Sequence, residues 1–222
     1  MPHGHLPETG FLSGASQRLK EMLDSQAREI ALTSGDVLFQ QGDEGDALFA
    51  ILTGALEVSV LSSSGRKLSL DIMRPGAVFG EISLFDPGPR TATAIALEPS
   101  RVRRVRNRDV LEQIRRHPEL AVDMTRLAGQ RMRWMSTQLH EQVFLPMPVR
   151  LARKVLYLAP EGGDGMLSLS QSDLAEFVGA TREAVSKALA TWQRLGLVRA
   201  TRGGLVIHDR EALTRLTEPD LI

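Results

Sequence analysis

The sequence predicts an α+β protein with a β-rich N-terminal part, one long helix and a small helical C-terminal domain that ends in a hairpin. Three observations predict it: short apolar runs between glycines over 30–108, a helical apolar stripe over 118–144, and two short helices followed by two short strands over 170–207. A chain of 222 residues has room for one large domain or two smaller ones.

The β-rich part is marked by glycines that separate apolar runs at the spacing of about 8–12 residues typical of an all-β barrel or sandwich. Leu56, Val58 and Val60 alternate with polar residues, which is the pattern of a half-buried strand. The polar stretch 62–66 is expected to close a hairpin. The glycines are Gly35, Gly42, Gly45, Gly54, Gly65, Gly76, Gly80 and Gly88.

The long helix is expected to begin at Pro118 and to continue to Phe144, because this stretch contains no further proline and one glycine. A helix of 25 residues is about 37 Å long, more than a small domain needs to cover its own core. The stripe has two interpretations, packing on the chain's own barrel or a dimer seam that resembles a coiled coil. The length favours the dimer, with part of the stripe also facing the barrel. The stripe consists of Leu120, Met124, Leu127, Ala128, Met132, Met135, Leu139 and Val143.

The segment Leu145–Pro148 is expected to break the long helix, because proline lacks an amide donor and restricts the residue before it. It is the favoured hinge between two domains. Helical periodicity resumes over 149–159, and the glycine-rich stretch 161–165 is expected to be a loop.

The C-terminal part predicts a helix-turn-helix. Ser170 and Asp173 fit a capping box at the start of a short helix that stops at Gly179. Thr181 is expected to cap a second helix that ends at Gly196. Two helices with a tight glycine turn define this motif, and a hairpin around Arg202–Gly204 completes a winged helix.

In a helix-turn-helix the first residues of the second helix meet base edges in the major groove of DNA. Arg182 suits the O6 and N7 atoms of guanine, and Glu183 can accept from N4 of cytosine. The alternative is a polar helical hairpin that binds a protein. The expected DNA-binding residues are Thr181, Arg182, Glu183, Ser186 and Lys187, with Ser170 and Gln171 holding phosphates.

Taken over the whole chain, a net charge of zero argues against binding to nucleic acid, because 27 basic side chains balance 27 acidic ones. The balance is uneven along the chain: residues 1–100 carry 7 basic and 13 acidic side chains, 101–160 carry 13 and 5, and 161–222 carry 7 and 9. The zero is therefore a sum of unlike parts. The run Arg101, Arg103, Arg104, Arg106 and Arg108 is interpreted as an exposed strand, with contact to DNA or polymerase as the alternative.

Several classes of protein are disfavoured. The chain has no cysteine, which excludes disulfides, cysteine-ligated metals and iron–sulfur clusters. Its five histidines, at 3, 5, 117, 140 and 208, show no ligand spacing, so neither a metal nor a haem is expected. No Walker loop or nucleophile–base pair is evident, so an enzyme is not expected. The longest apolar stretch is too short to cross a bilayer, and a cytoplasmic protein without membrane attachment is expected.

The most informative stretch is Phe79–Ala92. Gly80 permits a close approach of the backbone, Glu81 can accept two hydrogen bonds from a diol, and Arg90 offers a planar fork to a phosphate. Amides near Thr91 and Ala92 can add an anion-binding concavity. The alternative is that Glu81 and Arg90 pair with each other and Gly80 serves a bend.

With this cassette and the helix-turn-helix, the chain resembles the Crp/Fnr family of bacterial transcription regulators, close to its cyclic AMP receptor branch. Three blocks carry the resemblance over nearly the whole chain: 41–54, the cassette 79–92 and the helix-turn-helix 170–194. The resemblance implies a cyclic-nucleotide-binding jelly roll over 1–117, a dimerisation helix over 118–145 and a winged helix-turn-helix DNA-binding domain over 146–222.

By position in that family, Glu81 would take the ribose hydroxyl, and Arg90 with Thr91 the cyclic phosphate. The purine would meet the long helix near Met135 and Ser136, with Thr137 next. Met135 stands where the cyclic AMP receptor has a hydroxyl and cannot replace its hydrogen bond, although Ser136 or Thr137 can compensate. Thr91 after the cassette arginine can also favour guanine in related domains. The expected effector is cAMP, with cGMP second. The resemblance implies ligand-binding residues Gly80, Glu81, Ile82, Arg90, Thr91, Ala92, Met135, Ser136 and Thr137.

The resemblance also implies a homodimer that is gated allosterically by the nucleotide, binds a palindromic duplex and contacts RNA polymerase. The reading helix mixes two branches of the family, so a TGTGA-like and a TTGAT-like half-site both remain open. Two alternatives are kept: a regulator of this family with another effector or none, constitutive or haem-based, and a cyclic-nucleotide module that does not bind DNA.

Overall fold

The computed structural model describes residues 9–159, 166–201 and 204–218. The chain packs as two compact units. The first runs to Gly65 and resumes from Leu70 to Trp134, and the second takes Arg66–Ser69 and the described residues from Met135 onward. The boundary between them falls inside the long helix.

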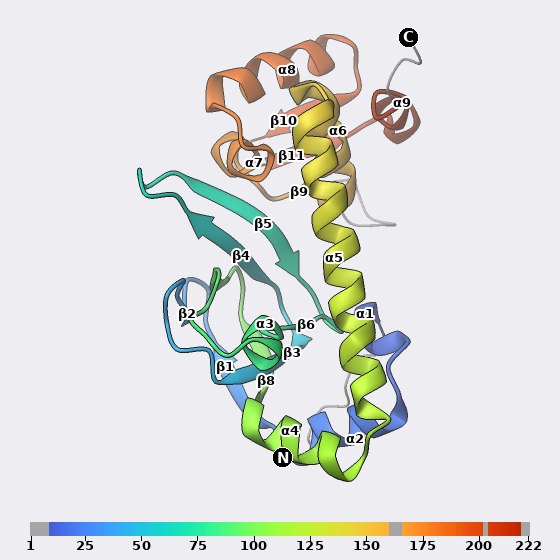
Figure 1. The fold of residues 1–222 in the computed structure, drawn as a ribbon. Helices are drawn as coiled ribbons and strands as arrows, with labels where there is room; N and C mark the ends of the chain where they lie inside the picture. The colour runs from blue at the N-terminus through green and yellow to red at the C-terminus, as the bar shows by residue number, and fades with distance from the viewer. Residues whose placement is uncertain (1–8, 160–165, 202–203, 219–222) are drawn as a thin grey trace. The chain divides into compact units, whose positions relative to one another are not determined.

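The first unit is built on two four-stranded sheets (Figure 1), with the strand orders β1-β8-β3-β6 and β2-β7-β4-β5. A tight turn with Gly65 at φ +77 joins β4 to β5, as the sequence predicts. The sheets confirm the jelly roll. The strands are β1 (Arg28–Leu32), β2 (Val37–Phe39), β3 (Ala47–Thr53), β4 (Leu56–Leu61), β5 (Lys67–Met73), β6 (Val78–Phe79), β7 (Thr93–Ala96) and β8 (Ser100–Arg106).

An aromatic cluster lies in the core of these sheets. The ring centroids of Phe39 and Phe79 each lie 5.5 Å from that of Phe49. Ile51 and Leu56 pack in the same core and are fully buried. Alternation along β3 places Phe49 and Ile51 on this face, and the buried apolar residues that alternate with them point the other way, into a second core.

A second core lies between the outer face of the β1-β8-β3-β6 sheet and four helices. These are α1 (Gly10–Ser13), α2 (Gln17–Ser25), α4 (Asn107–Arg116) and the start of α5 (Leu120–Phe144). Leu19, Leu120 and Met124 are among its buried side chains. Asp123 of α5 is buried and accepts hydrogen bonds from both the amide and the hydroxyl of Ser16, the residue that caps α2. The start of α5 is thereby fastened to the sandwich.

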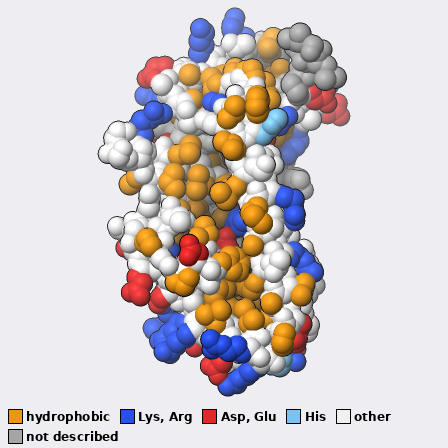
Figure 2. All heavy atoms as spheres, viewed as in Figure 1, with side chains coloured by type: hydrophobic (Ala, Val, Ile, Leu, Met, Phe, Trp, Pro, Cys, Tyr) orange, Lys and Arg blue, Asp and Glu red, His pale blue; other side chains and the backbone are white. Residues whose placement is uncertain are grey.

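The arginine-rich strand β8 is only partly exposed. Arg103 is 3% exposed and donates to the carbonyl oxygens of Leu23 (3.3 Å) and Asp24 (2.9 Å). The prediction of an exposed strand is therefore wrong for Arg103, because α2 covers that face of β8. Arg106 and Arg108 remain exposed, and Figure 2 shows Lys and Arg side chains gathered over the part of the unit where α4 lies.

The helix α5 spans 25 residues, close to its predicted bounds. Its first apolar positions are buried in the second core, as expected for the part that faces the barrel. Five of its later apolar side chains are each 58–70% exposed, and they are Met132, Met135, Leu139, Val143 and Phe144.

The second unit is a winged helix, as predicted. Its three strands have the order β10-β11-β9, and the fully buried Leu151, Val155 and Val185 lie in its interior. The predicted loop 161–165 and the wing residues Arg202 and Gly203 lie outside the described residues. The elements are α6 (Met147–Leu158), β9 (Met166–Leu167), α7 (Gln171–Val178), α8 (Arg182–Arg194), β10 (Val198–Thr201), β11 (Gly204–Ile207) and α9 (Arg210–Arg215).

The proline segment between α5 and α6 is bridged by side chains from α6. Arg153 forms an ion pair with Glu141 at 3.1 Å, and Arg150 donates to the carbonyl oxygen of Gln142 at 2.9 Å. The last turn of α5 contains no basic residue of its own. These cations of α6 therefore supply the positive charge that interacts favourably with the partial negative charge at the C-terminal end of α5.

None of the described helices is both long and apolar enough to cross a membrane.

Candidate functional sites

The cassette begins where β6 ends and turns into the short helix α3 (Ile82–Phe85). Gly80 occupies the turn with φ +84, a conformation that favours glycine. A Cβ added there would lie 2.9 Å from Arg90 Nη1 and 3.0 Å from the carbonyl oxygen of Ala47. Glycine at this position therefore leaves room for the Arg90 guanidinium against the backbone.

Arg90 is buried, with 6% of its surface exposed. Its Nη1 donates to the carbonyl oxygen of Gly80 (3.2 Å) and its Nη2 to that of Ala47 (2.8 Å). The guanidinium lies over the rings of Phe39 and Phe49, with its central carbon 4.5 and 5.3 Å from their centroids. The side chain is thus held in one place by backbone and aromatic contacts.

The charge on Arg90 is incompletely balanced. Its Nε atom is buried without a hydrogen-bond partner among the described residues. Burial lowers the pKa of Arg90 from its usual value, because desolvation disfavours the charged form. A buried donor without an acceptor is costly, so the pocket suits an anion that brings acceptor oxygens.

Glu81 pairs with a residue that the sequence analysis did not single out. Its Oε1 lies 3.2 Å from Arg131 Nε of α5, and Arg131 also donates to the carbonyl oxygen of Val78 at 3.1 Å. Glu81 is 4% exposed. The alternative of a Glu81–Arg90 pair is therefore wrong, because Glu81 is engaged by α5. The sequence offered no signal that distinguished Arg131 from Arg126 and Arg133, the other arginines of α5.

Asn107 was also missed, although it joins the loops around the cassette. Its Nδ2 donates to the carbonyl oxygens of Gly45 (3.2 Å) and Ser83 (3.0 Å). Its backbone amide donates to the carbonyl oxygen of Asp46 (2.8 Å). No sequence signal marked it, because these partners are distant in the chain.

The remaining expected ligand residues differ in their placement. Ala92 is buried, whereas Ile82 and Thr91 are exposed. Met135, Ser136 and Thr137 belong to the second unit, so the structure does not test whether they share a site with Gly80, Glu81 and Arg90. All three are exposed on α5.

The helix-turn-helix has the predicted caps. The Ser170 hydroxyl accepts from the Asp173 amide while the Asp173 carboxylate accepts from the Ser170 amide, which is a capping box. Gly179 ends α7 in the left-handed conformation with φ +62. The Thr181 hydroxyl accepts from the Ala184 amide at 3.2 Å and begins α8. Local capping therefore sets where α7 begins and ends and where α8 begins.

The expected reading residues lie on the exposed side of α8, while Val185, Leu189 and Trp192 are buried as predicted. Hydrogen bonds from its own backbone amide and from Thr181 hold the pKa of Glu183 below its usual value. Its carboxylate is therefore ionised near neutral pH and can accept a hydrogen bond. The exposed reading residues are Thr181, Arg182, Glu183, Ser186 and Lys187, and Ser170 is exposed beside them.

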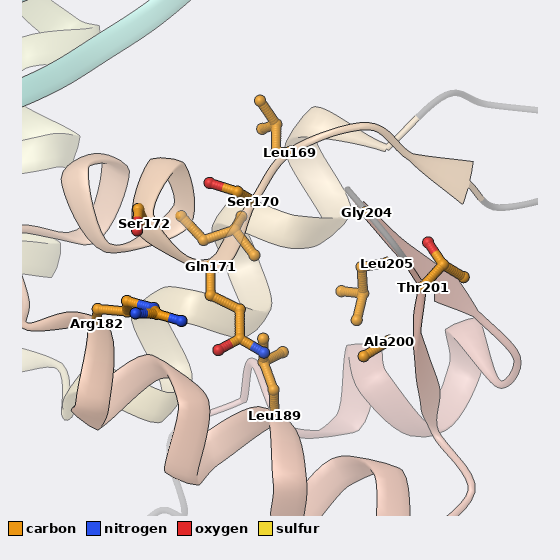
Figure 3. Close-up of a pocket in the computed structure, with 11 residues that line it drawn as sticks. Leu169, Ser170, Gln171, Ser172, Arg182, Leu189, Ala200, Thr201, Gly204 and Leu205 are labelled. Carbon is orange, nitrogen blue, oxygen red and sulfur yellow. The ribbon is translucent and has the colours of Figure 1, made fainter.

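A cavity of about 280 Å³ lies between the start of α7, the first half of α8 and the wing. In Figure 3 the side chain of Gln171 reaches into it from α7, and Arg182 extends toward Gln171 from α8. Thr201 and Gly204 of the wing line the other side, and the Thr201 hydroxyl is buried without a partner among the described residues. Neither wing residue was expected in the site.

In the described parts of the chain, no group of three or more His, Asp or Glu residues is arranged to hold a metal ion.

A β sandwich that holds a buried arginine at a glycine turn, followed in the chain by a winged helix with an exposed polar face, indicates a DNA-binding transcription regulator. Family models agree: a cyclic nucleotide-binding domain matches residues 29–117 and a Crp-like helix-turn-helix domain matches 149–216. The chain belongs to the Crp/Fnr family of transcription regulators. The family consists of transcription regulators, which confirms the expectation that this chain is a regulator and not an enzyme.

Two curated relatives are similar over most of their length. A "CRP-like cAMP-activated global transcriptional regulator" of Mycobacterium tuberculosis is 34% identical over 95% of this chain and 97% of its own. A "Cyclic AMP receptor protein" of Thermus thermophilus is 30% identical over 82% of this chain and 84% of its own. Among solved structures, a CRP/FNR-family transcriptional regulator of Thermus thermophilus has a TM-score of 0.75 at 26% identity, covering 86% of this chain and 99% of that one.

Proposed function

We propose that the protein is a homodimeric transcription regulator that binds a palindromic DNA site when a cyclic nucleotide, cAMP before cGMP, occupies the barrel. The observation that carries this proposal is Arg90, a buried cation with an unused Nε donor beside the glycine turn at Gly80. The names of the two curated relatives, both of which refer to cAMP, support the choice of nucleotide.

The nucleotide suits the residues of the cassette. Arg90 would hold the cyclic phosphate, and Glu81, fixed by Arg131, would accept from a ribose hydroxyl. Backbone near Thr91 and Ala92 would add donors to the phosphate. Ile82 would border the site, and Ser136 or Thr137 would contact the purine in place of the hydroxyl that Met135 lacks.

The second half of α5 supports the homodimer. Met132, Met135, Leu139 and Val143 are spaced three or four residues apart and are all mostly exposed. Such a stripe on a helix is buried when a second copy packs against it. We therefore propose that 118–145 is the dimerisation helix, with 1–117 as the sensor domain and 146–222 as the DNA-binding domain.

The nucleotide would act by shifting an equilibrium between two arrangements of the DNA-binding domains. A ligand favours one state only by binding it more tightly than the other. In the active state the two α8 helices must lie about 34 Å apart to enter successive major grooves. Arg182 and Glu183 would read bases in a TGTGA-like or TTGAT-like half-site, and Ser170, Gln171 and Lys187 would hold phosphates.

The test is a gel shift on palindromic duplexes carrying each half-site, without ligand and with cAMP or cGMP. We expect a shift that requires a nucleotide, with cAMP the more effective. A shift independent of ligand would indicate a regulator with another effector or none, and no shift under any condition would indicate a module that does not bind DNA. A regulator that binds chromosomal DNA would act in the cytoplasm and contact RNA polymerase there.

A further inference from the structure

The loop before β3 places a carboxylate beside the buried cation of the sensor domain. Asp46 Oδ1 lies 4.0 Å from Arg90 Nη2. The side chain of Asp46 is 52% exposed, whereas that of Arg90 is 5% exposed. A negative charge that water can reach therefore lies at the edge of the proposed phosphate site.

The backbone of this loop is held independently of the carboxylate. The amide of Asn107 donates to the carbonyl oxygen of Asp46 at 2.8 Å. A Cβ added at Gly45 would lie 2.3 Å from the Cβ of Ser83, so Gly45 packs directly against α3. Changing the Asp46 carboxylate is therefore expected to leave the loop in place.

A second arginine shares the Asp46 carboxylate. Arg104 of β8 pairs with Oδ2 of Asp46, while Oδ1 faces Arg90. Arg104 is directly opposite Phe49 in the β3–β8 register, and Phe49 is one of the rings under Arg90. Paired residues point to the same face of a sheet, so Arg104 extends from the same face as that ring.

Other charges around Arg90 have different partners. Asp46, Asp43 and Glu81 raise the pKa of Arg90 and Arg104 lowers it, so all four lie within electrostatic range, although desolvation dominates. Glu81 is engaged by Arg131, and the Asp43 carboxylate accepts from the Gln40 amide at 2.7 Å. Asp46 differs from both, because its ion-pair partner Arg104 itself lowers the pKa of Arg90.

We propose that the Asp46 carboxylate competes with the bound anion for Arg90. Arg104 limits this competition by holding the Asp46 carboxylate. The inference rests on the proposed cyclic-nucleotide function and names two residues that determine the affinity of its phosphate site. An entering phosphate and Asp46 carry like charge, so they repel each other. Without Arg104, the carboxylate is released to pair with Arg90.

The experiment is isothermal titration calorimetry of the full chain with cAMP and, separately, cGMP. Asp46→Asn is expected to tighten binding of both nucleotides about three- to tenfold, as for one unit charge removed near the site through partly screened surroundings. Arg104→Gln is expected to weaken binding about three- to tenfold. In the Asp46→Asn background the same Arg104→Gln change is expected to have less than half of that effect on the binding free energy.

Matched controls come from the same strand. Arg101 also pairs with a carboxylate, that of Glu29, but it is three residues from Arg104 and so points to the opposite face of β8. Arg101→Gln and Glu29→Gln are expected to leave both nucleotide affinities unchanged. Thermal denaturation of each variant checks that the fold is retained.

The outcomes separate this inference from the function on which it rests. If the wild-type protein binds neither nucleotide, the proposed function fails and this inference fails with it. If the wild type binds but Asp46→Asn binds no more tightly, only the competition by Asp46 is refuted. Equal losses from Arg104→Gln in both backgrounds would show that Arg104 acts on the ligand directly and would overturn its proposed role.

Discussion

The charged side chains of the two candidate sites differ in burial. In the sensor domain, Arg90 and Glu81 are buried, and each is held by partners from other elements. On the reading face, Arg182 and Lys187 are exposed to solvent. The side chains of the first site are held by the fold itself, whereas in the proposed function those of the reading face would be ordered by DNA.

Because of this difference, substitutions in the sensor domain are expected to change both stability and binding, whereas substitutions on the reading face are expected to change binding alone. A buried charge takes part in folding and in recognition at once, because removing it leaves buried partners unsatisfied. An exposed charge contributes little to the free energy of unfolding. Four substitutions, ordered from the largest expected effect to the smallest, test this contrast.

Arg90→Ala is expected to abolish nucleotide binding at accessible concentrations, a loss of about 3 kcal/mol or more, because charge-assisted hydrogen bonds to the phosphate disappear. Calorimetry with cAMP measures it. Arg106→Ala, which removes an exposed arginine at the end of β8, is the control and is expected to bind normally. Unchanged affinity in the Arg90 variant would refute the pocket.

Arg131→Gln is expected to lower the free energy of unfolding by about 2 kcal/mol, because it leaves the buried Glu81 without its cation. Urea denaturation measures the change. Adding Glu81→Gln is expected to recover part of the loss, since no buried charge then remains. If the loss of unfolding free energy in the double variant equalled the sum of the losses in the two single variants, the Glu81–Arg131 pair would not be the cause of the loss.

Arg182→Ala is expected to weaken specific DNA binding by about 1–3 kcal/mol and to relax preference at one base pair. The free energy of unfolding is expected to stay within about 0.5 kcal/mol of the wild type. Binding-site selection and anisotropy titrations measure the effect. Arg194→Ala, at the other end of α8, is the matched control. An unaltered selected site would count against α8 as the reading helix.

Lys187→Ala is expected to have the smallest effect, a weakening of DNA binding that is similar for all sequences. The slope of log affinity against log salt is expected to fall by about 1, because one phosphate contact is lost. Titrations at several salt concentrations on specific and random duplexes measure it. A change in sequence preference instead would assign Lys187 to the bases.

Much of the fold could be predicted because its signals are local. Alternation along Leu56–Val60, the capping box at Ser170 and Asp173, and the turn at Gly179 each involve residues a few positions apart. The same holds for the cassette, where Gly80 and Arg90 are close in sequence and meet in the structure. The positions of Met135, Ser136 and Thr137 in the ligand site stay predictions.

By itself, the sequence determined the type and order of the elements, because hydrophobic periodicity and capping act within one or two turns of chain. The tertiary structure decided the partners of the buried charges. Glu81 pairs with Arg131 rather than Arg90, Arg103 is covered by α2, and Asp46 is shared by Arg90 and Arg104. Such choices depend on strand register and on which helix covers which face, and residues 44 or more positions apart carry no local pattern that records them.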